Sequence, residues 1–597
     1  MYKSLTLLLS LFLCACANSI ATAPSSPETE SAKVTTLSQV IKQGMVVTAN
    51  PHATKAGADV LRNGGSAVDA AIAIQSVLSL VEPQSSGMAG GGFMIHFENQ
   101  DNTLSVYDGR EKAPETISPT QFLDTDGEVM NYFDRKHSGL STGVPGIVSM
   151  LQLAHADHGK LPWGSQFKRA SELAEGGFEV SARLHYFTSR FARFLPKEIN
   201  EGPPDAYEYF YDTDGKPYPV GYLLKNPAYA QTLKTIAEDP RSFYEGDLAK
   251  EIVAKVRMPP RSGALTLDDM VSFKASKKTA LCSGYGSKKV CGPPPPSSWL
   301  AVGEIMGLID SKKPFDNNGA ASVSNWIEFA EAQRLAYADR DRFVGDAEFV
   351  KVPTEGMLSR RYWQKRMNDG GKAKASQALA AGDPWAFESQ REPMYGSDNT
   401  VDMAGTTHFV VMDSDGDVVS MTSSVESIFG SARMSGGMFL NNQLTDFASK
   451  PTDPKGNQVA NRIEPGKRPR SSMSPTIILD EDGEFLMATG SPGGNSIIAY
   501  TAKTIVGVFE WGLSPQEAVE LPNLVARGDK VRIEKDRASK ELIQGLKSYG
   551  FNVKESAGEN SGLSVLKRNH DGSLSGGVDS RREGTIEVVD FELDYRR

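Results

Sequence analysis

Two strands joined by a tight turn, at residues 406–424, constrain the fold more than any other segment. Residues 406–413 and 418–424 are rich in Val, Thr and other strand-forming residues, and between them Ser-Asp-Gly-Asp is typical of a hairpin turn. Upstream, residues 150–400 are mostly helical in pattern, with long amphipathic stretches. The chain therefore combines a large helical part with a later part built of strands.

Two helices are predicted near the beginning of the chain. The first covers residues 48–63, starts near Pro51 and is ended by a Gly-Gly pair. Ser66 is the expected N-cap of the second helix, in which residues 70–81 are small and apolar almost all round. Because a helix without a polar face has no side to present to water, this second helix should be buried.

A glycine-rich turn at residues 85–92 connects the second helix to predicted strands at 93–97 and 104–107. Its glycines could lie against a ligand, but close packing of the helix on a strand explains them equally well. Arg110 follows the second strand after two residues. Its side chain can pair with Glu111, or its guanidinium can form two hydrogen bonds to a carboxylate ligand.

The charge balance argues against a nucleic-acid partner. The 597 residues include 64 Lys and Arg against 74 Asp and Glu, a formal net charge of −10, whereas phosphate binding needs a clustered cationic surface. With 39% hydrophobic and 23% charged residues the composition is that of a soluble globular protein. The glycine motifs of phosphate loops and dinucleotide-binding turns are absent from the sequence.

The N-terminal segment, residues 1–16, is predicted to be an export signal. Its apolar run is preceded by a Lys and is too short to cross a bilayer. Cys16 follows a small residue, as in a bacterial lipoprotein box, so it is the candidate lipidation site; ordinary cleavage near Ala17 is the alternative. Residues 17–40 are expected to be a flexible tether. The protein is therefore expected in the periplasm or cell envelope of a bacterium, with a lipid anchor to the membrane as one arrangement.

The two cysteines that lie after the N-terminal segment, Cys282 and Cys291, flank a turn-like stretch. In an oxidising compartment they are expected to form one disulfide that closes a hairpin, which is favoured over a metal site because the spacing is not CxxC and no His lies nearby. His155 and His158 have a spacing that resembles a ligand pair, but a solvated helix face is the favoured interpretation. No metal site is expected.

Thr406 directly follows Gly405 at the start of the predicted hairpin. If the bond between them is cut, Thr406 gains a free α-amine that can accept the proton of its own hydroxyl, which turns a poor nucleophile into a useful one. Gly405 suits self-cleavage because its carbonyl carries no Cβ to shield it. Taken alone, Gly-Thr-Thr before a strand is more often explained by β-propensity.

The chain resembles the γ-glutamyltranspeptidases, which are N-terminal nucleophile hydrolases that cleave themselves into two chains. The resemblance runs over nearly the whole sequence and rests on segments that occur in order: NPHATKAGADVLRNGGSAVDAAIA (50–73), GMAGGGF (87–93), DGREKAP (108–114), PPPPSS (293–298), GTTHFVVMDSDGDVVSMTSS (405–424), FLNNQLTDF (439–447), KRPRSSMSPTI (467–477) and GSPGG (490–494). It implies an α+β fold, a four-layer αββα sandwich formed by both cleavage products, a large subunit (41–405) and a small subunit (406–597).

The same resemblance implies a role for each candidate site residue. Thr406 would be the nucleophile of self-cleavage and catalysis, and Gly493 and Gly494 would supply the oxyanion hole. The substrate-binding residues would be of two kinds: Arg110, Ser471 and Ser472 for the donor α-carboxylate, and Glu426, Gln443 and Asp446 for its ammonium.

Three features differ from the best-studied family members. Ser424 and Glu426, both expected to contact substrate, stand where those members have Thr and Asn. Residues 448–465 lack the aromatic residue that closes the pocket in some members, which implies an open site that admits bulkier donors and lets water compete with acceptor amines.

The activity implied is acyl transfer by a γ-glutamyltransferase and glutathione hydrolase. An ester on Thr406 would carry the γ-glutamyl group of glutathione and related amides to water, amino acids or peptides, without metal or organic cofactor. Two alternatives use the same machinery, a glutaryl (cephalosporin) acylase and a poly-γ-glutamate depolymerase. A third is an unprocessed surface binding protein without enzymatic activity.

Overall fold

The computed structural model describes residues 42–591 apart from 192–193, 198–202, 313, 371–374, 393, 399, 401–404 and 559–560. The predicted export signal, Cys16 and the tether lie outside the described residues. Within the described part of the chain, no helix is both long enough and apolar enough to cross a membrane.

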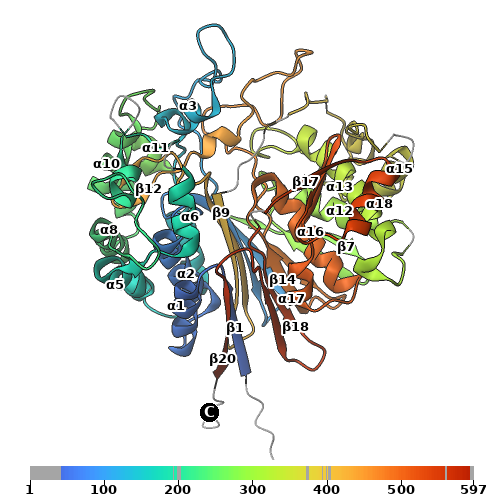
Figure 1. Ribbon diagram of the computed structural model, residues 1–597, viewed down its shortest axis with the longest axis horizontal. Helices are drawn as coiled ribbons and strands as arrows, with labels where there is room; N and C mark the ends of the chain where they lie inside the picture. Colours follow the sequence, from blue (N-terminus) through green and yellow to red (C-terminus); the bar gives the residue numbers. More distant parts are fainter. Residues whose placement is uncertain are drawn as a thin grey trace, which may run out of the picture. The chain divides into compact units, whose positions relative to one another are not determined.

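A seven-stranded antiparallel sheet forms one central layer (Figure 1). Its strand order is β20-β1-β9-β10-β2-β3-β6. The strands are β1 (Lys42–Thr48), β2 (Gly91–Glu98), β3 (Thr103–Asp108), β6 (Ser276–Thr279), β9 (Gly405–Met412), β10 (Val418–Glu426) and β20 (Thr585–Phe591). The predicted hairpin at 406–424 is confirmed, and it occupies the middle of this sheet between strands from earlier in the chain.

A second antiparallel sheet, of six strands, packs against the first. Its order is β19-β18-β14-β13-β8-β7, with β7 (Leu281–Tyr285), β8 (Lys288–Gly292), β13 (Thr476–Leu479), β14 (Phe485–Gly490), β18 (Ser564–Arg568) and β19 (Leu574–Val578). The predicted disulfide between Cys282 and Cys291 is present and joins β7 to β8. Buried apolar side chains from both sheets, including Val410, Met412 and Leu566, fill the space between them.

Helices cover the outer face of each sheet (Figure 1). The first sheet is covered by α1 (Pro51–Arg62), α2 (Ala67–Val81), α4 (Ile147–His158), α5 (Lys168–Gly176), α6 (Ala182–Phe191), α8 (Pro227–Glu238) and α10 (Asp247–Val256). The second is covered by α12 (Trp299–Asp310), α13 (Val323–Phe343), α15 (Arg360–Gly370), α16 (Ile497–Phe509), α17 (Pro515–Glu520) and α18 (Lys540–Tyr549). The predicted four-layer αββα sandwich is confirmed.

Helix α2 shows why the local sequence signals were informative. Ser66 caps it as predicted, accepting a hydrogen bond from the amide of Asp69 while the Asp69 side chain accepts one from the Ser66 amide. The helix is buried along almost its whole length against β9 and β10. It thus supports the hairpin that begins at Gly405 from the side opposite to the second sheet.

The region 150–400 is less uniformly helical than its sequence pattern predicts. It also contributes β6 to the first sheet and β7 and β8 to the second. Strand β6 has the sequence Ser-Lys-Lys-Thr and forms an edge of its sheet, where polar side chains are tolerated and charged ones prevent further pairing. Because β6 has no alternation of apolar and polar residues, its sequence did not indicate a strand.

Candidate active site

The pleat of β9 directs Thr406 and Thr407 to opposite faces of the sheet. Side chains alternate along a strand, so Thr406 shares its face with Val410, which lies between the two sheets. Thr407 shares its face with Phe409, which belongs to the core beneath the helices. Of the two adjacent threonines, only Thr406 lies on the side where a cavity opens between the sheets.

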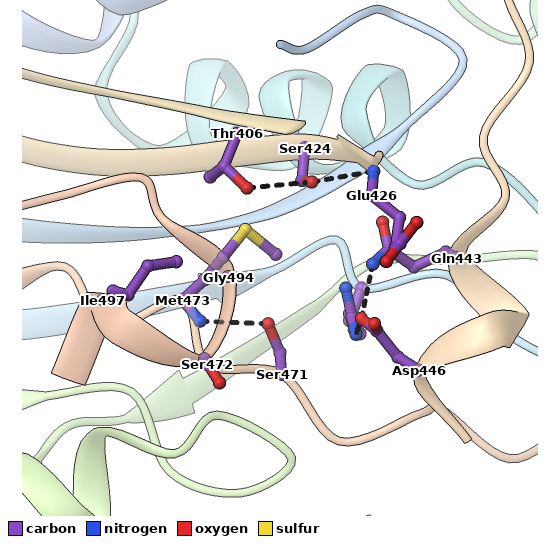
Figure 2. A pocket seen from close by; sticks show the side chains of 11 residues that line it. Thr406, Ser424, Glu426, Gln443, Asp446, Ser471, Ser472, Met473, Gly494 and Ile497 are labelled. Carbon is purple, nitrogen blue, oxygen red and sulfur yellow. Dashed lines mark hydrogen bonds and ion pairs between the residues drawn. The ribbon is translucent and has the colours of Figure 1, made fainter. Parts of the chain in front are cut away.

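Strand pairing sets Thr406 directly opposite Ser424 on β10. The two hydroxyl oxygens are 3.2 Å apart (Figure 2), and the Ser424 hydroxyl also donates to the carbonyl oxygen of Gly405 over 2.7 Å. The amide of Glu426 donates to Ser424 Oγ over 2.8 Å. Because the single proton of Ser424 is used on Gly405, the Thr406 hydroxyl must be the donor in its bond with Ser424. Thr406 is thus held beside the Gly405 carbonyl with its proton directed away from that carbonyl.

The cavity beside Thr406 contains nine of the ten predicted catalytic and substrate-binding residues (Figure 2). Its lining consists of Arg110, Thr406, Ser424, Glu426, Gln443, Asp446, Ser471, Ser472, Met473, Gly494 and Ile497. Gly493 is the predicted site residue that is not part of this lining. Gly493 and Gly494 have positive φ angles of 138° and 56°, a conformation that favours glycine, and they lead into α16.

Arg110 is completely buried at one end of the cavity. Its Nε donates to the carbonyl of Pro469, and its Nη2 donates to the carbonyl of Arg470 over 2.8 Å and to Asp446 Oδ2 over 2.6 Å. Its Nη1 has no hydrogen-bond partner among the described residues and lies 3.6 Å from Glu111. Three acceptors therefore hold the guanidinium rigidly, and its Nη1 makes only the longer contact with Glu111.

Two carboxylates and an amide, those of Glu426, Asp446 and Gln443, line the cavity together with Arg110. Gln443 and Asp446 lie one helical turn apart, and Gln443 Nε2 donates to Asp446 Oδ2 over 2.6 Å. Glu426 follows a bulge in β10, has a positive φ of 80°, and accepts a hydrogen bond from Asn442. Gln443 Oε1 has no hydrogen-bond partner among the described residues. This side of the cavity therefore presents acceptors.

Glu111 affects the charge that Arg110 presents. Burial raises the pKa of the Glu111 carboxyl to about 8, although the neighbouring guanidinium of Arg110 opposes the shift. Both carboxyl oxygens lack hydrogen-bond partners within the described part of the chain. At neutral pH the Glu111 carboxyl is therefore mostly protonated, so it adds no second negative charge beside Arg110, whose guanidinium is already paired with Asp446.

The sequence did not identify two buried arginines that hold site residues. Arg582 Nη1 donates to the carbonyl oxygen of Thr406 over 2.9 Å, and Arg340 Nη2 donates to Ser472 Oγ over 2.7 Å. Met473 and Ile497, which line the cavity, were also not predicted. Arg582 lies 176 residues from Thr406 in the chain, so no local pattern could have connected them.

Comparisons with known proteins identify the family of the chain. The family model for gamma-glutamyltranspeptidase matches residues 53–589. The glutathione hydrolase proenzyme of Bacillus subtilis (strain 168) is 32% identical over 553 residues, which cover 91% of each chain. That of Escherichia coli (strain K12) is 33% identical over 559 residues and 90% of each chain.

A solved structure shares the fold. The cephalosporin acylase from Bacillus halodurans superposes with a TM-score of 0.78 over 95% of this chain and 99% of its own, at 23% identity. At that identity the likeness concerns the fold alone. The family is shown instead by the match of the family model to most of the chain and by the two relatives, so this chain belongs to the gamma-glutamyltranspeptidase family.

Proposed function

We propose that the chain is a precursor that cleaves itself at Gly405–Thr406 and then acts as a γ-glutamyltransferase and glutathione hydrolase. The observation that carries this proposal is the hydrogen-bonded chain from Thr406 through Ser424 to the Gly405 carbonyl, at the edge of a cavity that contains Arg110. The two relatives named glutathione hydrolase proenzyme support both the activity and the processing.

Self-cleavage follows from the three groups already in contact. Thr406 Oγ attacks the Gly405 carbonyl carbon, while Ser424 stabilises the negative charge that develops on the carbonyl oxygen. The C–N bond then breaks, the nitrogen takes up the hydroxyl proton, and an ester joins Gly405 to Thr406. Water hydrolyses this ester, which leaves a Gly405 carboxylate and a Thr406 with a free amine and a free hydroxyl.

The cavity suits the two charges of a γ-glutamyl donor. In this proposal the α-carboxylate binds to Nη1 of Arg110, which has no hydrogen-bond partner among the described residues. The α-ammonium binds to Gln443 Oε1 with Asp446 and Glu426. A glutaryl group lacks this ammonium and would make no contact between opposite charges with Glu426 or Asp446. The γ-glutamyl group should therefore be preferred over the glutaryl group of the alternative acylase, and initial rates on the two anilides measure this preference.

Turnover uses the same atoms after cleavage. The liberated amine of Thr406 accepts the hydroxyl proton, the oxygen attacks the γ-amide, and Gly494 with Gly493 stabilises the oxyanion through backbone N–H groups. The acyl ester is then transferred to water, an amino acid or a peptide. None of residues 448–465, all of which are described, lines the cavity, which supports hydrolysis as a major outcome.

Substitution of the two adjacent threonines tests the proposal. Thr406→Ala should give a folded, full-length and inactive chain, and Thr406→Ser should be cleaved slowly and retain measurable activity. Thr407→Ala is the matched control, because the Thr407 side chain lies on the opposite face and should not affect cleavage. N-terminal sequencing of the small chain of the natural protein should give Thr-Thr-His-Phe as the first four residues. Cleavage of Thr406→Ala at this bond would refute the mechanism.

The proposal also includes the fate of the precursor in the cell. Residues 41–405 and 406–597 would remain together as large and small subunits, since strands from both build the first sheet. Export to the periplasm or cell envelope, with Cys16 lipidated, can be tested by labelling cells with radioactive palmitate. Label on the natural chain and none on Cys16→Ser is expected; equal labelling would exclude Cys16 as the lipidated residue.

A further inference from the structure

Two histidines and a glutamate meet on the helix-covered side of the first sheet, outside the cavity described above. His96 and Glu98 are two residues apart on β2 and so point to the same face, and His158 is the last residue of α4. One ligand atom from each of the three lies within 4.8 Å of the other two. His158 Nδ1 is 3.3 Å from Glu98 Oε2, and the two imidazole rings stack with centroids 3.8 Å apart.

Hydrogen bonding within the protein accounts for only part of this cluster. His158 Nε2 is buried without a hydrogen-bond partner among the described residues. The side chain of Asp417 lies beside Glu98, so two carboxyl groups are close together. The nearest lysines are already paired, Lys277 with Asp157 at 2.7 Å and Lys160 with Asp415 at 2.6 Å.

We propose that His96, Glu98 and His158 bind a divalent transition-metal ion of the Zn²⁺ class. Imidazole nitrogens and one carboxylate are the donor set that Zn²⁺ prefers, and water or a second carboxylate completes a tetrahedral site. Bonds of about 2.1 Å would bring the donor atoms to about 3.4 Å from one another. The His158 and Glu98 side chains are 16% and 30% exposed, so they can turn toward an ion and leave it a path of entry.

The position of the cluster separates it from the reaction. On β2, Gly91 pairs with Ser424, whereas His96 pairs with Val419. The five residue steps from Gly91 to His96 span about 17 Å of strand. A bound ion would therefore join the end of α4 to the sheet and stabilise the fold without contacting the substrate.

Binding can be measured with Zn²⁺ alone on the mature, untagged protein after treatment with a chelator. Calorimetric titration should give one ion per chain at this site, with affinity lowered at least about tenfold in His158→Ala and Glu98→Gln. His570→Ala is the matched control, because His570 is an exposed histidine in the turn after β18, and its variant should bind like the natural protein.

Stability and activity provide further tests. At 100 times the dissociation constant, Zn²⁺ should raise the Tm of the natural protein by about 2 °C, and that of the two ligand variants by less. The kcat should not change with Zn²⁺. If a variant fails to fold, Co²⁺ bound to the natural protein should still show the visible absorption of a tetrahedral site. Equal Zn²⁺ binding by the natural protein and the folded ligand variants, or no tetrahedral Co²⁺ spectrum, would overturn the proposal.

Discussion

Ser424→Ala should nearly abolish self-cleavage while leaving a folded precursor. The Ser424 hydroxyl is the donor to the Gly405 carbonyl oxygen, over 2.7 Å, and the acceptor for the Thr406 hydroxyl at 3.2 Å. Its removal takes away the group that stabilises the developing oxyanion and the group that orients the nucleophile. Both effects act on the transition state of the same step.

The expected size follows from comparable donors. Loss of one preorganised oxyanion donor slows a reaction about 10²- to 10³-fold, or about 2.7–4 kcal/mol in activation free energy. The folded precursor loses less free energy than the transition state, since its main new defect is the buried Glu426 amide that had donated to Ser424 Oγ. An unsatisfied buried amide costs about 1–3 kcal/mol of stability, so the chain should still fold.

The rate of conversion of precursor into two chains can be followed on denaturing gels. Ser424→Thr keeps the hydroxyl and should cleave within about tenfold of the natural rate, because only a methyl group is added. Ser420→Ala is the control on the same strand, as its hydroxyl contacts the Thr489 carbonyl instead. If Ser424→Ala cleaves as fast as Ser420→Ala, the orientation deduced for the Thr406 hydroxyl is wrong.

Three further variants test the binding of the donor carboxylate by Arg110 and the positioning of Thr406 by Arg582. Arg110→Lys should raise KM for γ-glutamyl anilide at least about tenfold and leave self-cleavage intact, because a lysine cannot replace a planar guanidinium held by three acceptors. An unchanged KM would assign Arg110 to a structural role. Above pH 8, ionised Glu111 should pair with Arg110 and raise KM, and Glu111→Gln should remove that rise relative to the natural enzyme. Arg582→Lys should lower kcat about 10- to 100-fold, with a Tm similar to that of the natural protein, since the Thr406 carbonyl loses its hydrogen bond to Arg582. A normal kcat would show that this contact does not position Thr406.

Much of the fold could be predicted from the sequence because its signals are local. Ser66 and Asp69 stand at the spacing of a capping box, and the apolar residues after them have no polar face, so α2 and its burial could be predicted from one short segment. The hairpin of β9 and β10 follows in the same way from its alternation and its turn. Strand β6 could not be predicted, because an edge strand of polar residues has no apolar alternation.

The candidate residues of the cavity could be predicted from family motifs that occur in order along the chain, whereas the contacts between these residues could not. Nothing in the sequence says that Arg110 and Asp446, 336 residues apart, are paired with each other, or that Arg582 holds the carbonyl of Thr406. Likewise His158 was expected on a solvated helix face, but the packing of α4 brings it to His96. These contacts depend on which elements become neighbours, and that is decided by sheet order and layer packing.

The sequence by itself therefore determined local elements such as α2 and the β9–β10 hairpin, and its resemblance to a known family implied the αββα class and the candidate residues of the cavity. The tertiary structure decided which of two adjacent threonines lies on the cavity side, because the pleat places Thr406 between the sheets and Thr407 beneath the helices. It also decided the direction of the Thr406–Ser424 hydrogen bond, because strand register sets Ser424 within reach of both Thr406 and the Gly405 carbonyl. Helix and strand formation depends on neighbours in the chain, whereas register and packing depend on contacts between residues far apart in the chain, which only the folded protein brings together.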